Sequence, residues 1–380
     1  MRFIHTSDWH LGRTLHNQSL LDEQAAMLQT LLKLIEEHQV DALLIAGDIF
    51  DRSVPPAAAV TLLDEFLEQV TLKLGVAVIA IGGNHDGQER IAFGARQMAG
   101  AGLYIQGPVA ADIKPIRIDG KSGSAFFYPI PYAEPALVRH LLELDIHTHE
   151  EALSALIERA LAHDNQGLPR VALSHCFIDG GSESDSERPL SIGGADKVSP
   201  SLFYPFDYAA LGHLHGPQFK GQQHVRYSGS PLKYSFSETK HNKSVTLVEL
   251  RAGEDPQITL LPITPRHDVR VIEGYLDALL EEGKTSSGRE DYLMVRLLDT
   301  HAILEPMAKL RAVYPNVLHL ERTGLLQERS ITGPGRERMQ KSELLMFEDF
   351  FNQVQGSPMT EAQRSLMSEL IASLHRGESK

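Results

Sequence analysis

The stretch DALLIAGDIFDR, residues 41–52, joins an uninterrupted apolar run to a polar end that carries Asp48 and Asp51. An apolar run of this length is typical of a strand that is buried on both faces of a sheet. Other stretches repeat this arrangement, and each ends in or just before a side chain that can bind a metal ion. They are RFIHT (2–6), VAVIAIG (76–82), RVALSH (170–175) and DYAALGH (207–213).

Amphipathic segments lie between the first of these strands. Residues 20–38 place leucine and isoleucine side chains at helical spacing and therefore predict a helix. A second helix is predicted to begin at Pro55-Pro56 and to end near Leu74. Proline is favourable in the first turn, because the N–H that it lacks would have no partner within the helix there. This alternation of strands and helices predicts an α/β core with helices packed on a central sheet.

The side chains at the strand ends are of the kinds that bind metal ions or transfer protons. They are Asp8 and His10 after the first strand, Asp48 and Asp51 after the second, Asn84 and His85 after the third, His175 at the end of the fourth, and His213 and His215 at the end of the fifth. In open α/β sheets, functional groups gather beyond the carboxyl ends of the strands. Each motif alone is more typical of a turn, a helix cap or an ordinary histidine. Their occurrence at successive strand ends predicts one shared metal centre.

Composition narrows the classes of protein to which the chain can belong. Its 380 residues are 42% hydrophobic, enough for two or three domains with a sizeable core. No apolar run approaches the ~18 residues of a membrane span, and MRFIHTSDWH turns polar too early for a secretion signal. Cys176 is the only cysteine, so we expect a reducing cytoplasm. The net charge of -14 means that any affinity for nucleic acid comes from a local patch, from bound metal or from a partner.

The sequence predicts three domains. The first covers residues 1–250, and a change of composition at RAGEDPQ (251–257) marks its end. A small α+β domain is expected over residues 258–330, with strands at 269–274, 292–298 and 317–322 and a helix at 305–314. ITGPGRERMQKS (331–342) has the composition of a linker, and one or two amphipathic helices follow it at residues 342–376.

The order of the motifs resembles that of a known superfamily. Asp-x-His, Gly-Asp-x-x-Asp-Arg, Gly-Asn-His-Asp, a lone His and Gly-His-x-His span residues 8–215 and are similar to the calcineurin-like metallophosphoesterases. HTSDWHLG, AGDIFD, GNHD, SDSERPLSIGGA, LGHLH and RYSGSPLKYSFSE further resemble the bacterial SbcD family of exonuclease subunits, the counterparts of the break-processing nuclease of archaea and eukaryotes. The closer resemblance covers nearly all of residues 1–250. It implies a layered αββα sandwich with a small α+β capping domain and C-terminal helices.

The resemblance also implies how the strand-end residues share two metal ions. One ion would be held by Asp8, His10, Asp48 and His215, and the other by Asp48, Asn84, His175 and His213. Because only Asp8 and Asp48 are anionic ligands, two divalent ions leave the site with an excess of positive charge that suits a phosphate. Mixed imidazole and carboxylate ligands fit manganese or iron and leave zinc open, and the resemblance favours two Mn²⁺ ions.

His85 is the predicted general acid. It directly follows the ligand Asn84, so we expect its side chain to point toward the substrate and to protonate the leaving oxygen. In the resembling family the position of Asp51 orients this histidine, as a carboxylate orients imidazole elsewhere. The alternative is that Asp51 caps the helix that begins at Pro55-Pro56.

The polar stretch DGGSESDSERPLSIGGADK, residues 179–197, follows His175. It is too long for a simple turn, and loops of this length are often functional. We expect it to form a wall of the substrate site.

The resemblance implies a nuclease subunit that hydrolyses DNA phosphodiester bonds in DNA repair, recombination and replication. Alone it would be a single-strand endonuclease. With an ABC-type ATPase it would be an ATP-dependent double-strand exonuclease that also acts on hairpin or blocked ends. The alternatives are a phosphomonoesterase or cyclic-nucleotide phosphodiesterase of the same fold, and a scaffold that has lost its chemistry. A small-molecule phosphatase has no use for residues 260–380, and every ligand position holds a competent residue, so the nuclease is favoured.

Two regions are predicted to bind other chains. The resemblance implies a homodimer through helix 55–74, with Ala58, Leu62, Phe66 and Val70, and through segment 91–99, with Ile91, Phe93, Ala95 and Met98. The alternative is that both stripes face the sheet. The helices at 342–376 resemble those that grip the base of the coiled coil in an SbcC-type ABC ATPase, which would give a heterotetramer. Their alternative is to fold back onto residues 260–325.

Overall fold

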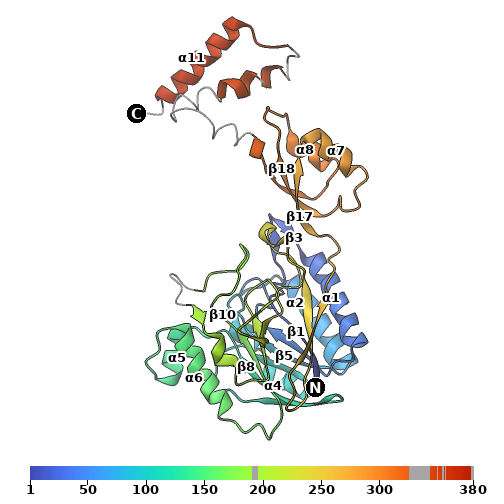
Figure 1. Cartoon of the computed structure of the whole chain (residues 1–380), viewed down its shortest axis with the longest axis vertical. Coiled ribbons are helices and arrows are strands. Elements are labelled where there is room, and N and C mark those ends of the chain that lie inside the picture. Colours follow the sequence, from blue (N-terminus) through green and yellow to red (C-terminus); the bar gives the residue numbers. More distant parts are fainter. Residues whose placement is uncertain (191–195, 325–342, 349, 353–354, 356, 378–380) are drawn as a thin grey trace. The chain divides into compact units, whose positions relative to one another are not determined.

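The computed structural model describes residues 1–190, 196–324, 343–348, 350–352, 355 and 357–377 (Figure 1). They form two compact units, Met1–Arg266 and His267–Lys380. Within these described ranges, no helix is both long and apolar enough to cross a membrane.

The first unit contains two large sheets. In the first sheet, the described strands lie in the order β16-β15-β1-β4-β5-β6. Their bounds are β1 Arg2–Thr6, β4 Ala42–Ala46, β5 Ala77–Ile81, β6 Leu103–Gln106, β15 Ser244–Glu249 and β16 Gln257–Pro262. Strands β1, β4, β5 and β6 are mutually parallel, whereas β15 and β16 are antiparallel to their neighbours. The parallel strands therefore deliver their carboxyl ends, and the residues that follow, to one edge of the sheet.

The second sheet has the described strand order β13-β14-β12-β9-β8-β7. Its strands are β7 Ile116–Gly120, β8 Gly123–Ile130, β9 Arg170–His175, β12 Tyr208–Gly212, β13 Gln218–Lys220 and β14 Gln222–Tyr227. Strands β8, β9, β12 and β14 are parallel. Because β9 and β12 are neighbours in register, with His175 opposite Gly212, both strands end at the same level.

The two sheets pack face to face. One buried cluster joins the sheets, with Phe3, Leu44 and Ile79 from the first and Phe127 and Leu173 from the second. The rings of Phe3 and Phe127 meet edge-on, with 5.8 Å between their centroids. These alternate strand positions face inward, as expected for strands whose successive side chains point to opposite faces.

Helices cover the outer faces of the sandwich. Figure 1 shows α1 (Leu21–Glu37) and α2 (Ala57–Glu68) on one side of the strands, and α5 (Pro135–Leu142) and α6 (His149–Leu161) on the other. The layered αββα arrangement predicted from the family is thus confirmed. The alternation of strands and helices alone indicated a central sheet, whereas the described strands form two large sheets. Strands of the second sheet such as β7 and β14 mix buried and exposed residues and lack the long apolar runs that reveal a strand in the sequence.

Short elements complete the first unit. They are β2 Thr14–Leu15, β3 Gln18–Ser19, a π-helical turn Gln69–Lys73 after α2, α3 Gln88–Ile91, α4 Ala95–Met98, β10 Phe177–Ile178, β11 Lys197–Val198, and 3-10 turns at Ala99–Ala101, Pro200–Phe203 and Phe236–Glu238. The helices predicted at 20–38 and from Pro55-Pro56 to Leu74 correspond to α1 and to α2 with its π-helical turn.

The first unit extends past the boundary predicted at residue 250. Strand β16 (Gln257–Pro262) pairs along its whole length with β15, so residues that we placed in the second domain complete the first sheet. The charged stretch RAGEDPQ that suggested a boundary includes the turn between these two strands. A polar turn within a hairpin and a linker between domains have similar compositions, which explains the difference.

The second unit is a small layer of parallel strands. It contains β17 (Val269–Gly274), β18 (Tyr292–Leu297) and β19 (Val317–Glu321), joined by α7 (Leu276–Gly283) and α8 (Pro306–Arg311). Both strand pairs are parallel because a helix follows each of the first two strands. The strands and the helix at 305–314 match the predicted elements, and α7 is additional.

The C-terminal part of this unit contains α11 (Glu361–Gly377) and helical residues at 343–348. Arg364 of α11 contacts Glu348 at 2.5 Å, and Ile371 is buried. The predicted linker at 331–342 lies outside the described residues.

Two large apolar residues of the helix predicted to form a dimer contact are turned inward. Phe66 and Val70 are buried, and the ring of Phe66 meets that of Trp9 edge-on at 5.4 Å. For these two residues the alternative, in which the stripe faces the sheet, is the one observed. In segment 91–99, however, the Phe93 side chain is 87% exposed.

Candidate metal centre

The loops that follow β1 and β4 are held together by main-chain hydrogen bonds. The amide of Asp8 donates to Gly47 O at 3.0 Å, that of His10 donates to Asp48 O at 3.0 Å, and that of Leu11 donates to Ile49 O at 2.9 Å. These bonds continue the parallel pairing of the two strands past their ends. They bring Asp8, His10 and Asp48 into one cluster.

Four of the seven predicted metal ligands have left-handed backbone conformations. The φ angles are 56° at Asp8, 45° at His10, 50° at Asp48 and 110° at His213. Such angles are uncommon outside glycine and cost about 1–3 kcal/mol each, so they persist only where the surrounding structure imposes them. Concentrated strain at potential ligands is typical of a functional site.

Two glycines allow the close approach of these loops. A Cβ added at Gly83 would lie 2.1 Å from Asp48 Oδ1, and one added at Gly47 would lie 2.3 Å from His175 Nδ1. Any larger residue at either position would displace a predicted ligand. The glycine in each Gly-Asp or Gly-Asn motif is therefore required by packing around the site.

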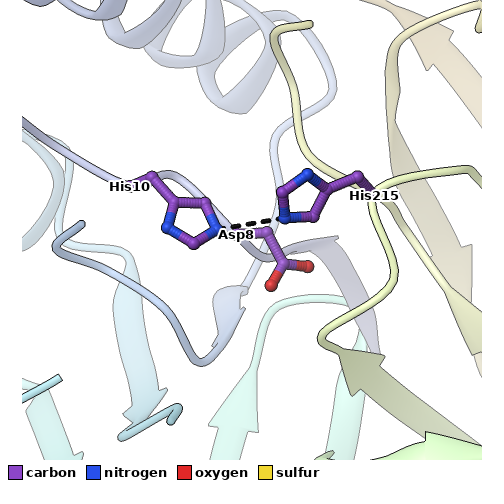
Figure 2. Close-up of side chains that lie close together, drawn as sticks. All are labelled: Asp8, His10 and His215. Atoms are coloured by element: carbon purple, nitrogen blue, oxygen red, sulfur yellow. Dashed lines mark hydrogen bonds between the residues drawn. The ribbon is translucent and has the colours of Figure 1, made fainter. Parts of the chain in front are cut away.

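Asp8, His10 and His215 form the first group of potential ligands, with one ligand atom from each lying within 4.8 Å of the others. Figure 2 shows the imidazoles of His10 and His215 turned toward each other beside the Asp8 carboxylate, with 3.1 Å between their Nε2 atoms. The Asp8 carboxylate accepts hydrogen bonds from Ser7 Oγ at 2.6 Å and from the His213 amide at 3.0 Å. Asp8 is thus fixed by neighbours from both sheets.

Asp8, Asp48 and His175 form a second group on the same 4.8 Å criterion. His175 Nε2 lies 3.6 Å from Asp48 Oδ2 and 2.9 Å from Asn84 Oδ1. Its Nδ1 lies 2.9 Å from the carbonyl of Ala46, which as an acceptor assigns the proton to Nδ1 and leaves the Nε2 lone pair facing the site. This arrangement is common for histidines that bind metals.

His213 does not join either group. Its ring meets that of His175 edge-on, with an interplanar angle of 76° and centroids 5.5 Å apart, and also contacts Phe177. Its main-chain amide, by contrast, binds the Asp8 carboxylate. The other six predicted ligands therefore come together, and the ring of His213 lies beside their cluster rather than within it.

His85 contacts Asp51 differently from the sequence prediction. His85 Nδ1 lies 2.8 Å from the main-chain carbonyl of Asp51, whereas the Asp51 carboxylate lies 3.7 Å from His10 Nδ1 and 3.5 Å from Arg13. Asp51 can thus orient His85 through its backbone. A sequence identifies the residue but not which of its atoms makes the contact.

Burial shapes the protonation of the cluster. It lowers the pKa of His10, His175 and His213, so these imidazoles are neutral near pH 7. Burial and the neighbouring Asp48 charge raise the pKa of Asp8. Neutral imidazoles beside crowded carboxylates are ready to bind a cation, whose charge would relieve the carboxylate repulsion.

The residues present fit a divalent metal ion. His10 Nδ1 is buried and has no hydrogen-bond partner, and the Nε2 atoms of His10 and His215 face each other although only one of them can donate to the other. A cation that accepts lone pairs from such nitrogens would supply the partner that they lack. Imidazole with carboxylate and amide oxygen is a donor set suited to first-row transition metals.

Sequence reasoning missed several residues that support the cluster. The buried Asp86 carboxylate accepts hydrogen bonds from the amides of Ile49, Phe50 and Gly83 at 2.9–3.1 Å, and so ties the loop after β5 to the loop after β4. Its burial, together with Asp48, raises its pKa to about 7. The buried Gln24 of α1 donates to His10 O at 2.7 Å. Asp86 could have been found as the last residue of Gly-Asn-His-Asp, but Gln24 has no local signal.

Glu238 is another such residue. Burial opposes its ionisation, but contacts with His215 and Lys243 hold its pKa below the ordinary value. It belongs to the stretch RYSGSPLKYSFSE (226–238), whose role the sequence left undefined.

Comparison with known proteins gives the chain its relatives. Residues 1–217 match the calcineurin-like phosphoesterase family, and residues 265–355 match a family described as type 5 capsule protein repressor C-terminal domain. The SbcD component of nuclease SbcCD from Staphylococcus epidermidis is 31% identical over 373 residues, with 98% of each chain covered. The same component from Staphylococcus saprophyticus is 32% identical over 385 residues, with 100% of each covered.

A solved structure, TT1561 of Thermus thermophilus, covers 68% of this chain and is itself covered to 98%, at 13% identity and a TM-score of 0.37. That likeness is too low to bear on function. The full-length matches and the match over the first 217 residues agree with the motifs and with the geometry of the metal centre. The chain therefore belongs to the calcineurin-like phosphoesterase family and, within it, to the family of SbcD nucleases.

Proposed function

We propose that this chain hydrolyses DNA phosphodiester bonds at a centre of two metal ions, as the nuclease component of a complex with an ABC-type ATPase. Alone it acts as an endonuclease on single-stranded DNA. With the ATPase it acts as an ATP-dependent exonuclease on duplex ends, including hairpin and blocked ends. These activities serve DNA repair, recombination and replication.

The position of Asp48 is the observation that carries this proposal. Its Oδ2 atom lies 3.7 Å from His10 Nε2, 3.6 Å from His175 Nε2 and 3.9 Å from His85 Nε2. One carboxylate oxygen thus faces histidines from both predicted ligand groups. Such a placement favours a bridging carboxylate between two ions over a single isolated ion.

The ligands divide between the ions around this bridge. Asp8, His10, Asp48 and His215 would hold one ion, and Asp48, Asn84, His175 and His213 would hold the other. Bound divalent cations supply Lewis-acid stabilisation of the charge that develops on a phosphodiester. The mixed imidazole and oxygen ligands fit manganese or iron, and the family resemblance favours Mn²⁺.

His85 is the proton donor in this proposal. The carbonyl of Asp51 occupies its Nδ1, so its Nε2 is the atom that faces the cluster. The amide of His85 also donates to Asp48 Oδ1 at 2.9 Å, which fixes the distance between the histidine and the bridging carboxylate. His85 can therefore hold a proton at Nε2 and transfer it to the leaving oxygen.

Helix α11 is the proposed contact with the ATPase. Leu366, Leu370 and Leu374 recur every four residues on α11 and are 60%, 49% and 69% exposed. Contiguous exposed apolar side chains usually mark an interaction site, and the coiled coil of an SbcC-type ATPase would cover them. Because the net charge of the chain is -14, the partner would supply much of the positive surface that binds DNA.

A homodimer completes the proposed assembly as a heterotetramer. Phe93 is 87% exposed and Val60 is 46% exposed, and both lie in segments that the family resemblance assigns to a two-fold contact. Phe66 and Val70, which we expected to contribute, are buried within the unit.

A substrate comparison tests the proposed function. The purified chain, alone and with its ATPase, is incubated with Mn²⁺ and single-stranded DNA, hairpin-ended duplex DNA or p-nitrophenyl phosphate. We expect the chain alone to cut single strands, and duplex cutting to need both the ATPase and ATP. Fast hydrolysis of p-nitrophenyl phosphate without DNA cleavage would instead support a phosphomonoesterase of the same fold.

A further inference from the structure

Behind His215 lies a buried polar cluster that the proposed ligand set does not include. The Glu238 carboxylate is fully buried and accepts hydrogen bonds from the Ser186 hydroxyl at one oxygen and from the Lys243 ammonium at the other. Lys243 also donates to the main-chain carbonyl of His215 at 2.9 Å and to Ser230 Oγ at 2.8 Å. Because a buried ion pair is stable only when its polar atoms are bonded, these contacts fix the cluster in one arrangement.

The hydrogen bonds of this cluster define the tautomer of His215. Ser186 Oγ lies 2.6 Å from His215 Nδ1. Its single hydroxyl proton is donated to the Glu238 carboxylate, which can only accept. The serine oxygen must then accept from His215, so Nδ1 carries the proton. The Nε2 lone pair of His215 is left facing His10 and Asp8, where a metal ion would bind.

The serine in this relay comes from the long polar loop after β9 rather than from a strand. The same loop contacts His215 a second time. The Glu187 carboxylate accepts hydrogen bonds from the His215 amide at 2.8 Å and from the Ser184 amide at 2.6 Å. The Arg13 guanidinium donates to the carbonyl of Ser186 at 2.9 Å. Residues 182–188 are thus tied to a ligand through both side-chain and main-chain atoms.

We propose that Ser186 and Glu238 are positioning residues that present His215 Nε2 to the metal ion at Asp8 and His10, and that occupancy of this site and the order of loop 182–188 depend on each other. This inference rests on the proposed two-metal function and assigns a role to the stretches SDSERPLSIGGA and RYSGSPLKYSFSE. It also makes the loop that we expect to form a wall of the substrate site responsive to the metal.

Removal of one oxygen atom tests the relay. Ser186→Ala removes the acceptor that lies 2.6 Å from His215 Nδ1 and leaves only the Glu238 carboxylate, 3.4 Å away. Ser182→Ala changes a serine of the same loop whose side chain makes no contact in the relay. Calorimetric titration with Mn²⁺ is followed by hydrogen exchange of the peptide that covers 182–188, with and without Mn²⁺. Thermal unfolding of the metal-free variants verifies that both still fold.

We expect Ser186→Ala to weaken one of the two Mn²⁺ sites by about 10–100-fold, as loss of a contact to a ligating histidine typically does, and to leave the other site unchanged. Mn²⁺ should slow exchange of the 182–188 peptide in the wild type and in Ser182→Ala, but not in Ser186→Ala at a concentration that fills the unaffected site. A role in folding alone would change exchange equally with and without metal. Wild-type affinity and protection in Ser186→Ala would overturn this inference and leave the proposed function intact. A wild-type chain that binds no Mn²⁺ would overturn both.

Discussion

His85, the proposed proton donor, makes two contacts that favour proton transfer over metal binding. Its Nδ1 faces the Asp51 carbonyl at 2.8 Å, and its Nε2 lies 3.9 Å from Asp48 Oδ2. We therefore expect His85→Ala to keep both Mn²⁺ ions and to lose about 10²–10⁴-fold in the rate of DNA cleavage. Single-turnover cleavage at saturating Mn²⁺, with occupancy measured by calorimetry, separates the two effects. The exposed His140 of α5 provides the control variant His140→Ala, and near-normal turnover of His85→Ala would remove His85 from the mechanism.

His5 makes stability depend on pH. It is fully buried between the sheets, where it contacts Tyr208 Oη and Leu211 O, and burial lowers its pKa to about 3. An unfolded histidine has a pKa near ~6.5. Between these pKa values the unfolded chain binds a proton that the folded chain does not. The contribution of His5 to the free energy of unfolding is therefore present in full above pH ~6.5 and is lost as the pH drops toward 3.

The size of this effect can be measured with a variant. We expect His5→Gln to reduce the pH slope of the unfolding free energy between pH 6 and 4 by about 1.4 kcal/mol per pH unit. Urea unfolding in EDTA, followed by the fluorescence of Trp9, the only tryptophan, reports on the first unit. His140→Gln should keep the wild-type slope, and identical slopes for His5→Gln and wild type would contradict this assignment.

At the residue scale, the sequence was informative about which side chains meet and uninformative about how they meet. Six of the seven predicted ligands come together, because each follows the end of a strand that an apolar run reveals. The carbonyl of Asp51, the carboxylate of Asp86 and the side chain of Gln24 act through contacts that depend on tertiary structure. No local pattern encodes such contacts.

Among the elements, α11 offers the clearest surface for a partner. Leu366→Glu combined with Leu370→Glu should abolish co-purification with the ATPase and ATP-dependent cutting of duplex ends, because two charges replace apolar contacts on one face. Mn²⁺-dependent cutting of single strands should persist. Ser368→Glu alters an exposed position between these leucines, about 160° away around the helix, and serves as the control. Undiminished ATPase binding by the double variant would place the contact elsewhere.

The exposed Phe93 allows a sharper test of the dimer than α2 does. Phe66 packs on Trp9, so a charge at Phe66 would disturb folding as well as any dimer. Phe93→Glu changes a side chain that is 87% exposed and should convert a dimeric chain to a monomer that still folds. Light scattering at micromolar concentration measures the mass. A monomeric wild type, or a variant that stays dimeric, would refute a contact through Phe93.

Elements with strong periodicity were predictable, and those defined by their neighbours were not. Strand β4 is buried throughout and α1 has a regular apolar face, so both stand out in the sequence. Strand β7 alternates between buried and exposed residues, and β16 is mostly exposed at the sheet edge. Their strand conformation is stabilised by pairing with β8 and β15, which lies beyond what a single sequence reveals.

On the scale of the whole molecule, the sandwich explains why predicted ligands from distant parts of the sequence share one site. The first sheet contributes Asp8, Asp48 and Asn84, and the second contributes His175 and His215. Both sheets direct the ends of their parallel strands toward the cluster, as the contacts between His175 and Asp48 and between His10 and His215 require. The candidate metal centre is therefore a product of the packing of the two sheets.

Calorimetric titration of the metal-free chain with Mn²⁺ tests the two-metal centre most directly. We expect two ions per chain in the wild type. Asp48→Ala should lose both ions together with DNA cleavage, because the same carboxylate faces both ligand groups. Asp64→Ala, at an aspartate of α2 outside the cluster, should bind two ions normally. Two ions bound by Asp48→Ala at wild-type affinity would contradict the bridging role of Asp48 and the two-metal centre built on it.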